Sequence, residues 1–194
     1  MKRPLAIALA LVLAAPLVLL GCGKKNPVKV ETPEPFVYAA RSTPKGTVLR
    51  LAQAYTNRDT VVTASVYADD YHGSSVDLSD PGSDSLLFSK ADEVRSVASM
   101  TLSNSITYTN ADFKLPATWN ELHYVSDPSD WITVQIPSFQ IEVVDIYNNG
   151  YNARAPSNGE TWIFEFTLRP TPDASSPTGN TWTIVRWVES RNHL

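Results

Sequence analysis

The sequence predicts an α+β fold in which N-terminal helices pack on a strongly curved antiparallel sheet. Two segments within residues 43–104 carry apolar residues at helical spacing. From Ile106 onward, apolar and polar residues alternate with a period of two, which is typical of half-buried strands. Helices followed by a run of strands indicate α+β rather than a parallel α/β sheet.

The first helix is expected to begin at Thr43. Its hydroxyl can cap the helix, and Pro44 suits the first helical position. The apolar residues that follow share one helical face: Val48, Leu51, Ala52 and Tyr55. The polar run that starts at Asn57 ends the helix.

The next segment, DTVVTASVYADDY, is ambiguous by local propensity. Its β-branched residues from Thr60 to Thr63 favour a strand. Asp59 as a cap and the spacing of Ala64 and Ala68 allow a short helix instead. The following YHGSSVDLSD predicts a short strand that leads into the loop PGSD.

A second clear helix is predicted from Ser89. Ser89 can cap it, and Asp92 three residues later completes a capping-box-like start. One face of this helix is formed by Val94, Val97, Ala98 and Thr101.

The second half of the chain predicts an antiparallel meander. The alternating segments are SITYTNADFKL, WITVQIPSFQIEVVDIY, ETWIFEFTLRP and TWTIVRWVES. Pro137 marks a bulge or an edge position. Turn-rich connectors separate the later strands.

The N-terminus has the layout of a secretory signal peptide. Lys2 and Arg3 precede an uncharged apolar run, and Gly21 stands before Cys22, the only cysteine. A membrane-spanning helix would need roughly 17–25 apolar residues. This run is short for that and contains Pro16, so a cleaved signal over residues 1–21 is favoured.

The sequence Leu19-Leu20-Gly21-Cys22 resembles the bacterial lipoprotein signal, the lipobox. The resemblance implies cleavage between Gly21 and Cys22, a diacylglycerol on the Cys22 thiol, and a further acyl chain such as palmitate. Two or more chains anchor stably, at about 0.8 kcal/mol per buried methylene. Gly23 resembles the residue that directs such proteins to the periplasmic face of the outer membrane in diderm bacteria.

Residues 22–42 are predicted to be a tether, because prolines favour extended backbone there. The domain proper is assigned to residues 43–194 and must fold without disulfides. Removal of Lys2 and Arg3 changes the net charge from −4 to −6. An acidic domain argues against a nucleic-acid partner and against a basic membrane-binding face, so the lipid is the expected membrane contact.

The domain resembles the nuclear transport factor two-like superfamily of α+β cones. The resemblance is carried by TPKGTVLRLAQAYTNRDTVVTASVYADDY, by the helix from Ser89 and by WTIVRWVES, over residues 43–190. It implies a conical pocket and favours a second helix that ends in YADD. The superfamily includes ketosteroid isomerases, polyketide cyclases, dehydratases and binding proteins, so the fold does not select an activity.

The resemblance to isomerase-like members implies a carboxylate base on the strand after YADD, with hydroxyl donors in an apolar pocket. Asp77 is the nearest candidate, with Tyr55, Tyr67 or Tyr71 as donors. The spacing from Asp70 to Asp77 is longer than that motif requires. An Asp77 that faces solvent or a turn is therefore the favoured interpretation.

The remaining polar residues predict no further site. Asp69 and Asp70 are adjacent and would point to different sides of a helical turn. The three histidines lack ligand spacing, so no metal or cofactor is expected. Trp162 and Phe164 are expected to face the first helix. The full set of pocket candidates is Tyr55, Tyr67, Tyr71, Trp162, Phe164 and Trp187.

The sequence therefore favours a lipid-anchored, exported, non-catalytic module that binds a small apolar ligand or an envelope protein. One alternative is an isomerase, dehydratase or cyclase that uses Asp77 and a tyrosine. Another is a purely structural envelope protein. The oligomeric state stays open, a homodimer included.

Overall fold

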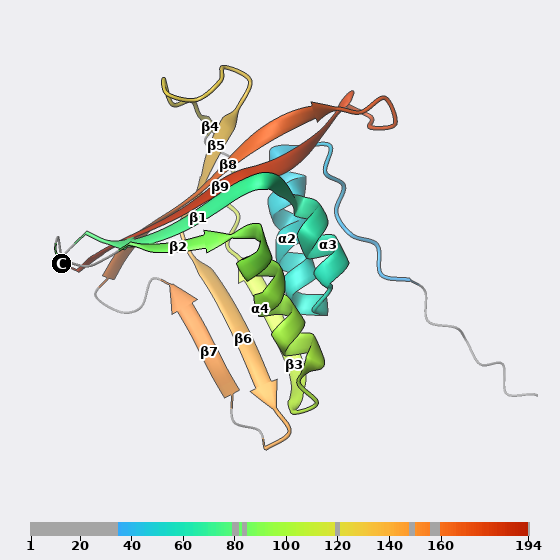
Figure 1. The fold of residues 1–194 in the computed structure, drawn as a ribbon, viewed down its shortest axis with the longest axis vertical. Coiled ribbons are helices and arrows are strands. Elements are labelled where there is room, and N and C mark those ends of the chain that lie inside the picture. Colours follow the sequence, from blue (N-terminus) through green and yellow to red (C-terminus); the bar gives the residue numbers. More distant parts are fainter. Residues whose placement is uncertain are drawn as a thin grey trace, which may run out of the picture. The chain divides into compact units, whose positions relative to one another are not determined.

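The structure, a computed structural model, describes residues 35–78, 82, 85–118, 121–147, 150–155 and 160–193. The chain divides into two compact units, Met1–Phe36 and Val37–Leu194, and the second is described below (Figure 1). The expected signal peptide and the lipobox around Cys22 lie outside the described residues. None of the helices in the described part of the chain is long and apolar enough to cross a membrane.

The first helix of the unit, α2 (Pro44–Asn57), begins and ends as its sequence predicts. The Thr43 hydroxyl accepts a hydrogen bond from the backbone N–H of Gly46 at 3.0 Å, and Pro44 opens the helix. Arg58 ends it in the left-handed conformation, with a φ of 54°, and its N–H donates to the Tyr55 carbonyl at 3.1 Å. Val48 and Leu51 are fully buried on the predicted face.

The ambiguous segment after α2 forms a helix, α3 (Thr60–Val66), despite its β-branched residues. The Asp59 carboxylate caps it by accepting from the Val62 N–H at 2.9 Å. The expectation that this helix extends through YADD is wrong, because strand β1 (Tyr67–Asp77) begins directly after Val66. Tyr67 pairs with Ile184 of a distant strand, β9 (Asn180–His193), and the pairing resumes at His72, so the segment belongs to the sheet.

The two adjacent aspartates therefore lie on a strand rather than on a helical turn. Asp69 pairs with Lys90 at 2.8 Å, and Asp70 pairs with Arg169 at 2.9 Å. Each carboxylate has its own cation, and the two do not form a shared site.

The second predicted helix is confirmed as α4 (Lys90–Leu102), which follows the short strand β2 (Leu86–Ser89). Its capping box is complete, since the Asp92 N–H donates to Ser89 Oγ at 3.3 Å and the Ser89 N–H donates to Asp92 Oδ2 at 2.9 Å. In Figure 1, α2, α3 and α4 lie together on one side of the long strands β1 and β9.

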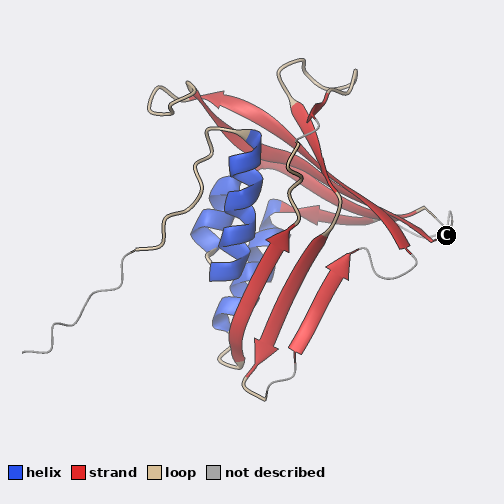
Figure 2. Ribbon diagram, turned by 180° about the vertical axis from the view of Figure 1, so that it is seen from behind, coloured by secondary structure: helices blue, strands red, loops and turns tan. Residues whose placement is uncertain are grey.

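The strands form two sheets rather than the single meander predicted from the sequence. The larger sheet has the order β2-β1-β9-β8-β5-β4, and the smaller has the order β3-β6-β7. Figure 2 shows the smaller sheet as a separate layer. The further strands are β3 (Ile106–Phe113), β4 (Glu121–Leu122), β5 (Ile132–Ile136), β6 (Phe139–Asp145), β7 (Gly150–Ala155) and β8 (Glu160–Pro172).

The two sheets differ from the predicted meander in which strands pair. Strand β5 pairs with β8, whereas β6 pairs with β3 and β7, so the chain changes sheet between Ile136 and Phe139. Pro137 lies at this change, where its missing N–H removes no ladder hydrogen bond. Strands β1 and β9 run parallel, and the other described pairs are antiparallel.

The core lies between the helices and the concave side of the larger sheet. Phe164 and Phe166 of β8 are fully buried with Val48 and Leu51 of α2 in one hydrophobic cluster, and Trp162 packs partly buried against it. The smaller sheet contributes Phe139, whose ring centroid lies 4.8 Å from that of Phe164. The predicted class, helices packed on a curved and mainly antiparallel sheet, is confirmed.

Candidate functional site

A cavity of about 390 Å³ lies between α4, β1, β6 and β9, with the end of α2 at one side. This volume falls within the range of about 300–1,000 Å³ that small-molecule sites occupy. Much of its wall is apolar and is formed by Phe88, Met100, Phe139, Ile141, Val143 and Trp187.

The polar end of the cavity is organised around Glu93, on the first turn of α4. The Tyr55 hydroxyl donates to Glu93 Oε2 at 2.8 Å, and the Tyr71 hydroxyl donates to Glu93 Oε1 at 2.8 Å. Three elements, α2, β1 and α4, thus meet at one carboxylate. A second carboxylate, Glu189 of β9, also lines the cavity.

Local structure explains why these side chains face inward. The Ser89 capping box fixes the first turn of α4 and holds Asp92 at the cap, while the adjacent Glu93 bonds to the two tyrosines. Along β1 the side chains alternate, so Tyr71 and Gly73 are buried while His72 is exposed.

Gly73 makes room for the tyrosine that reaches Glu93. A Cβ at this position would lie 2.5 Å from the Tyr71 hydroxyl oxygen and 3.3 Å from Phe88 Cβ. A side chain here would displace the Tyr71 hydroxyl, so glycine is required by close approach rather than by its backbone angles.

The cavity perturbs the titration of the groups at its polar end. Burial raises the pKa of Glu93, although the hydrogen bonds from Tyr55 and Tyr71 partly offset the effect. Burial and the nearby Glu93 raise the pKa of both tyrosines, so their hydroxyls stay protonated and act as donors.

Glu189 is the more strongly perturbed carboxyl group. Burial raises its pKa to about 7; a hydrogen bond from Ser75 opposes the shift, and the charge of Glu93 adds to it. Glu189 therefore changes its charge near neutral pH. A carboxyl group with that property, in a cavity, can hold or transfer a proton.

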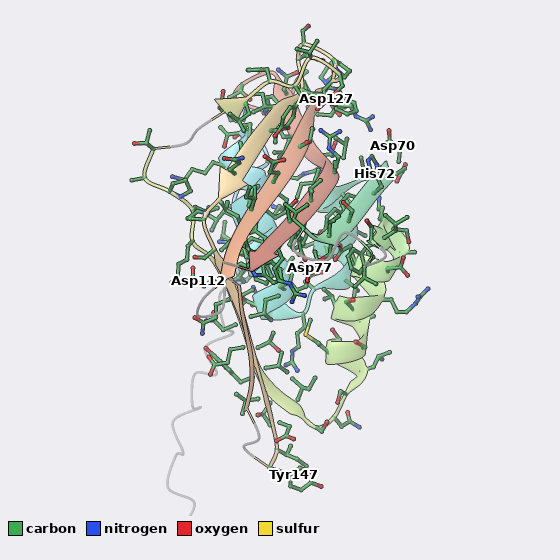
Figure 3. The ribbon with its side chains drawn as sticks, turned by 90° about the vertical axis from the view of Figure 1, so that its left-hand side faces the viewer. Asp70, His72, Asp77, Asp112, Asp127 and Tyr147 are labelled. Carbon is green, nitrogen blue, oxygen red and sulfur yellow. The ribbon has the colours of Figure 1, made fainter. Side chains whose placement is uncertain are left out.

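Asp77, the base suggested by the sequence, does not line this cavity. It ends β1 and pairs with Arg191, with Oδ2 and Nη2 2.6 Å apart. Its side chain is only 18% exposed, so the expectation of a solvated Asp77 is wrong. The parallel register places Asp77 opposite Arg191, a contact that only the β1–β9 pairing creates. Figure 3 shows it apart from Asp70 and His72, which lie together at the edge of the domain.

The structure separates the six pocket candidates into two groups. Tyr55, Tyr71 and Trp187 line the cavity. Tyr67 does not line the cavity; its ring centroid lies 4.3 Å from that of Tyr71, and its hydroxyl is buried near the Tyr55 hydroxyl. Phe164 belongs to the core, and Trp162 lines a separate, smaller hollow of about 270 Å³ beside Pro137.

Neither of the cavity carboxylates was identified from the sequence, although the spacing of each from nearby apolar residues indicates that it faces inward. Glu93 precedes Val97 and Met100 by four and seven residues, which places an acid on the inward face of α4. Glu189 follows Trp187 by two residues and shares its face of β9. In both cases, a charged residue shares a face with a large apolar residue.

A metal centre has no support in the described part of the chain. No group of three or more His, Cys, Asp or Glu side chains gathers there in a way that could hold a metal ion.

No protein-family model and no curated protein matches this sequence. The similar solved structures share its fold at low identity. The β subunit of a candidate aromatic-ring-hydroxylating dioxygenase from Novosphingobium aromaticivorans is 8% identical, with 79% of this chain and 90% of that chain covered and a TM-score of 0.51.

Two further solved structures have lower TM-scores. A conserved protein from Planctomyces limnophilus is 15% identical over 77% of this chain and 94% of its own, with a TM-score of 0.49. A nuclear transport factor 2-like superfamily protein from Salmonella enterica is 9% identical over 76% and 87%, with a TM-score of 0.44. At 8% identity the likeness to the dioxygenase β subunit concerns the fold alone, which in this chain is a set of helices packed on a curved, mainly antiparallel sheet.

Proposed function

We propose that this domain binds a small, largely apolar molecule carrying one polar group, and that a lipid on Cys22 holds the protein at the cell envelope. The observation behind the binding role is the cavity of about 390 Å³, in which an apolar wall leads to a polar end containing Glu93 and Glu189. Small-molecule sites commonly have this composition.

The energetics of the cavity fit such a ligand. Covering its apolar wall gains roughly 25 cal/mol for each Å² removed from water. Placing an apolar group against Glu93 and Glu189 would cost free energy, because carboxylates excluded from water need partners. A ligand with an apolar body and one polar end satisfies both requirements. A purely structural protein would have no need of an open cavity of this size.

The binding role is tested with naphthylmethanol, a neutral apolar probe, followed by quenching of tryptophan fluorescence. Val143→Trp would fill the cavity from β6 and should abolish binding. Val61→Trp is the matched control, because Val61 is 77% exposed on α3 and lies outside the cavity. Binding that survives Val143→Trp, or that the unaltered protein lacks, would contradict the proposal.

A second candidate function is proton transfer at carbon beside a carbonyl group. It is favoured by the Glu189 pKa of about 7, since a general base works best with a pKa near the working pH. In this scheme Glu189 takes the role that the sequence suggested for Asp77. The Tyr71 hydroxyl becomes available to the carbonyl oxygen if a ligand draws it from Glu93.

The enzymatic alternative is tested by exchange of ketone α-protons with deuterated water, followed by NMR. Exchange catalysed by Glu189 should rise with pH through about 7, and Glu189→Gln should lower it about 10²–10⁴-fold. Glu165→Gln is the control, because that carboxylate bonds to Tyr124 and Gln135 away from the cavity. Exchange unaffected by Glu189→Gln would exclude Glu189 as the base.

A further inference from the structure

We infer that the cavity selects a cation, namely an organic amine with an apolar body whose ammonium group lies against Glu93 and Glu189. This inference rests on the proposed binding function and specifies its ligand class. It follows from the charges that line the cavity, from the use of its hydrogen-bond donors and from the aromatic residues of its wall.

The charges that line the cavity have one sign. Asp92, Glu93 and Glu189 contribute carboxylates, and no Lys, Arg or His among the described residues lines it. Asp92 is already paired with Arg95 at 3.0 Å. The uncompensated charge therefore belongs to Glu93 and Glu189, and an anionic ligand would meet like charge in a partly desolvated site.

The hydrogen-bond donors of the cavity are largely used within the protein. The Tyr55 and Tyr71 hydroxyls donate to Glu93. Those of Ser96 and Ser99 donate to carbonyl groups of α4 at 3.1 and 2.7 Å. The Trp187 indole N–H is the exception, because it has no hydrogen-bond partner among the described residues, but it is buried and is not exposed to a ligand in the cavity.

Acceptors, in contrast, remain available. A carboxylate offers about four lone-pair positions, and each oxygen of Glu93 uses one for a tyrosine. Glu93 and Glu189 therefore present acceptors rather than donors to the cavity. The complementary ligand group must donate hydrogen bonds, and an ammonium group donates three while it neutralises charge.

The aromatic wall of the cavity is complementary to the apolar body of such an amine. Phe88, Phe139 and Trp187 provide aromatic surface beside the carboxylates. Aromatic faces attract cations as well as apolar groups, most strongly at tryptophan. The same wall can therefore hold the apolar body and favour the charged end.

Three matched naphthalene compounds test this inference on the full chain: naphthylmethylamine, which is a cation, naphthylmethanol, which is neutral, and naphthoate, which is an anion. Calorimetry at about pH 8, where Glu189 is mostly charged, should give the amine an affinity about 10–100-fold above that of the alcohol, because charge-assisted hydrogen bonds are added. Naphthoate should bind most weakly. If none of the three binds, the proposed binding function fails; if the alcohol or naphthoate binds as tightly as the amine, binding stands and the cation inference is overturned.

Two variants, one inside the cavity and one outside it, test whether the charge of Glu189 causes the preference for the amine. Glu189→Gln should lower the amine affinity about tenfold or more and the naphthylmethanol affinity much less, because only the amine loses a charge-assisted hydrogen bond, and circular dichroism should show that the variant is folded. Glu142→Gln is the control, since Glu142 lies on β6 between the cavity residues Ile141 and Val143 but on the opposite face of the strand. Equal losses for amine and alcohol in Glu189→Gln would contradict the charge-based selection.

The pH dependence gives an independent measurement. The titratable groups that line the cavity with Glu189 are Glu93 and Asp92 of α4, Tyr55 of α2 and Tyr71 of β1, and Glu189 accepts a hydrogen bond from Ser75 of β1. Amine affinity should rise between about pH 6 and pH 8 as Glu189 loses its proton, and the rise should be absent in Glu189→Gln. A flat profile in the unaltered protein would overturn the role of Glu189.

Discussion

At the scale of single residues, the hydrogen bonding in the cavity depends on Gly73, which has no side chain of its own. The Tyr71 hydroxyl reaches Glu93 only because Gly73 leaves space beside it. Strand pairing explains the closeness, since Gly73 lies opposite Phe88 on one side and Trp187 on the other. A backbone position on β1 thereby controls the hydrogen bonding of a carboxylate on α4.

Gly73→Ala should therefore displace Tyr71 and remove one hydrogen bond from Glu93. That bond favours the charged carboxylate, so its loss should raise the Glu93 pKa further, and overpacking should destabilise the domain by about 1–3 kcal/mol. NMR titration of the Glu93 carboxyl carbon and chemical denaturation measure the two effects. Gly150→Ala is the control, because the nearest atom to its added Cβ would be 4.0 Å away; an unchanged Glu93 titration in Gly73→Ala would contradict the account.

The cap of α3 provides a second prediction at this scale. The Asp59 carboxylate accepts from the Val62 N–H and from the Tyr38 hydroxyl, both at 2.9 Å. Asp59→Ala should cost about 1–2 kcal/mol in the free energy of unfolding, measured with urea. Asp130→Ala, at an exposed turn, should change it little.

The same carboxylate makes stability depend on pH. Hydrogen bonds, first from Val62, hold the Asp59 pKa below its usual value, so its contribution is present above the unfolded pKa of about 3.9. The contribution is lost as pH falls through the lower, folded pKa. The stability difference between Asp59→Ala and the unaltered protein should shrink in that acid range, and a constant difference would show that the charge plays no part.

At the scale of elements, β8 separates a core face from an exposed face. Phe164 is 0% exposed, whereas the adjacent Ile163 is 44% exposed. Phe164 also contacts the smaller sheet through Phe139, so it joins the two layers. It lies outside the residues that line the cavity.

Phe164→Ala should destabilise the domain by about 3–5 kcal/mol, because it leaves a cavity between packed layers. Ile163→Ala, on the other face of the same strand, should cost much less. Thermal or urea unfolding measures both. A small cost at Phe164 accompanied by loss of ligand binding would show that it lines the pocket instead.

At the scale of the whole molecule, the compact unit begins at Val37, before the domain start at Thr43 suggested by the sequence. The Tyr38 hydroxyl donates to Asp59 at 2.9 Å, and the Ala39 N–H donates to Gln53 Oε1 at 2.7 Å. The Trp182 N–H donates to the Arg41 carbonyl at 2.8 Å, and the Arg41 side chain donates to the Ser65 carbonyl. Part of the expected tether is thus bonded to the domain.

A fragment that spans residues 37–194 should therefore fold alone and be more stable than one that spans 43–194. Several hydrogen bonds, each worth about 0.5–1.5 kcal/mol, predict a difference of about 1–4 kcal/mol in unfolding free energy. Both midpoints should be insensitive to reductant and chelator. Equal stabilities would show that residues 37–42 contribute nothing, and a shift with chelator would reveal a metal site.

Anchoring is also a property of the whole chain. We expect the mature protein to begin at a lipidated Cys22, because residues 19–22 resemble the lipobox. Mass spectrometry of the mature N-terminus should find residues 1–21 removed, and Cys22→Ser should leave the precursor uncleaved. An intact Met1 in the membrane fraction, or an unmodified Cys22, would refute the anchor.

The parts of this protein that the sequence determines by itself are those set by contacts between near neighbours. The start of α2 at Thr43 and the capping box of Ser89 and Asp92 involve residues within four positions of each other. Alternation likewise predicted strands β3, β5, β6, β8 and β9, because the period depends only on the backbone. Strand β7 (Gly150–Ala155), in contrast, lies in a segment expected to be a turn-rich connector, and its pairing with β6 makes it a strand. The class of the fold follows from the order of these elements.

Only the tertiary structure decided which distant segments meet. The end of α3 at Val66 depends on the pairing of β1 with β9. The division into two sheets arises because β5 pairs with β8 whereas β6 pairs with β3. The site depends on the same choices, since Glu93, Tyr71 and Glu189 come from three elements far apart in sequence. Sequence periodicity shows which face a side chain occupies, but only long-range packing determines what that face meets. For this reason the sequence pointed to Asp77 as the candidate base and did not identify Glu93 and Glu189. In the structure, the β1–β9 register pairs Asp77 with Arg191 outside the cavity.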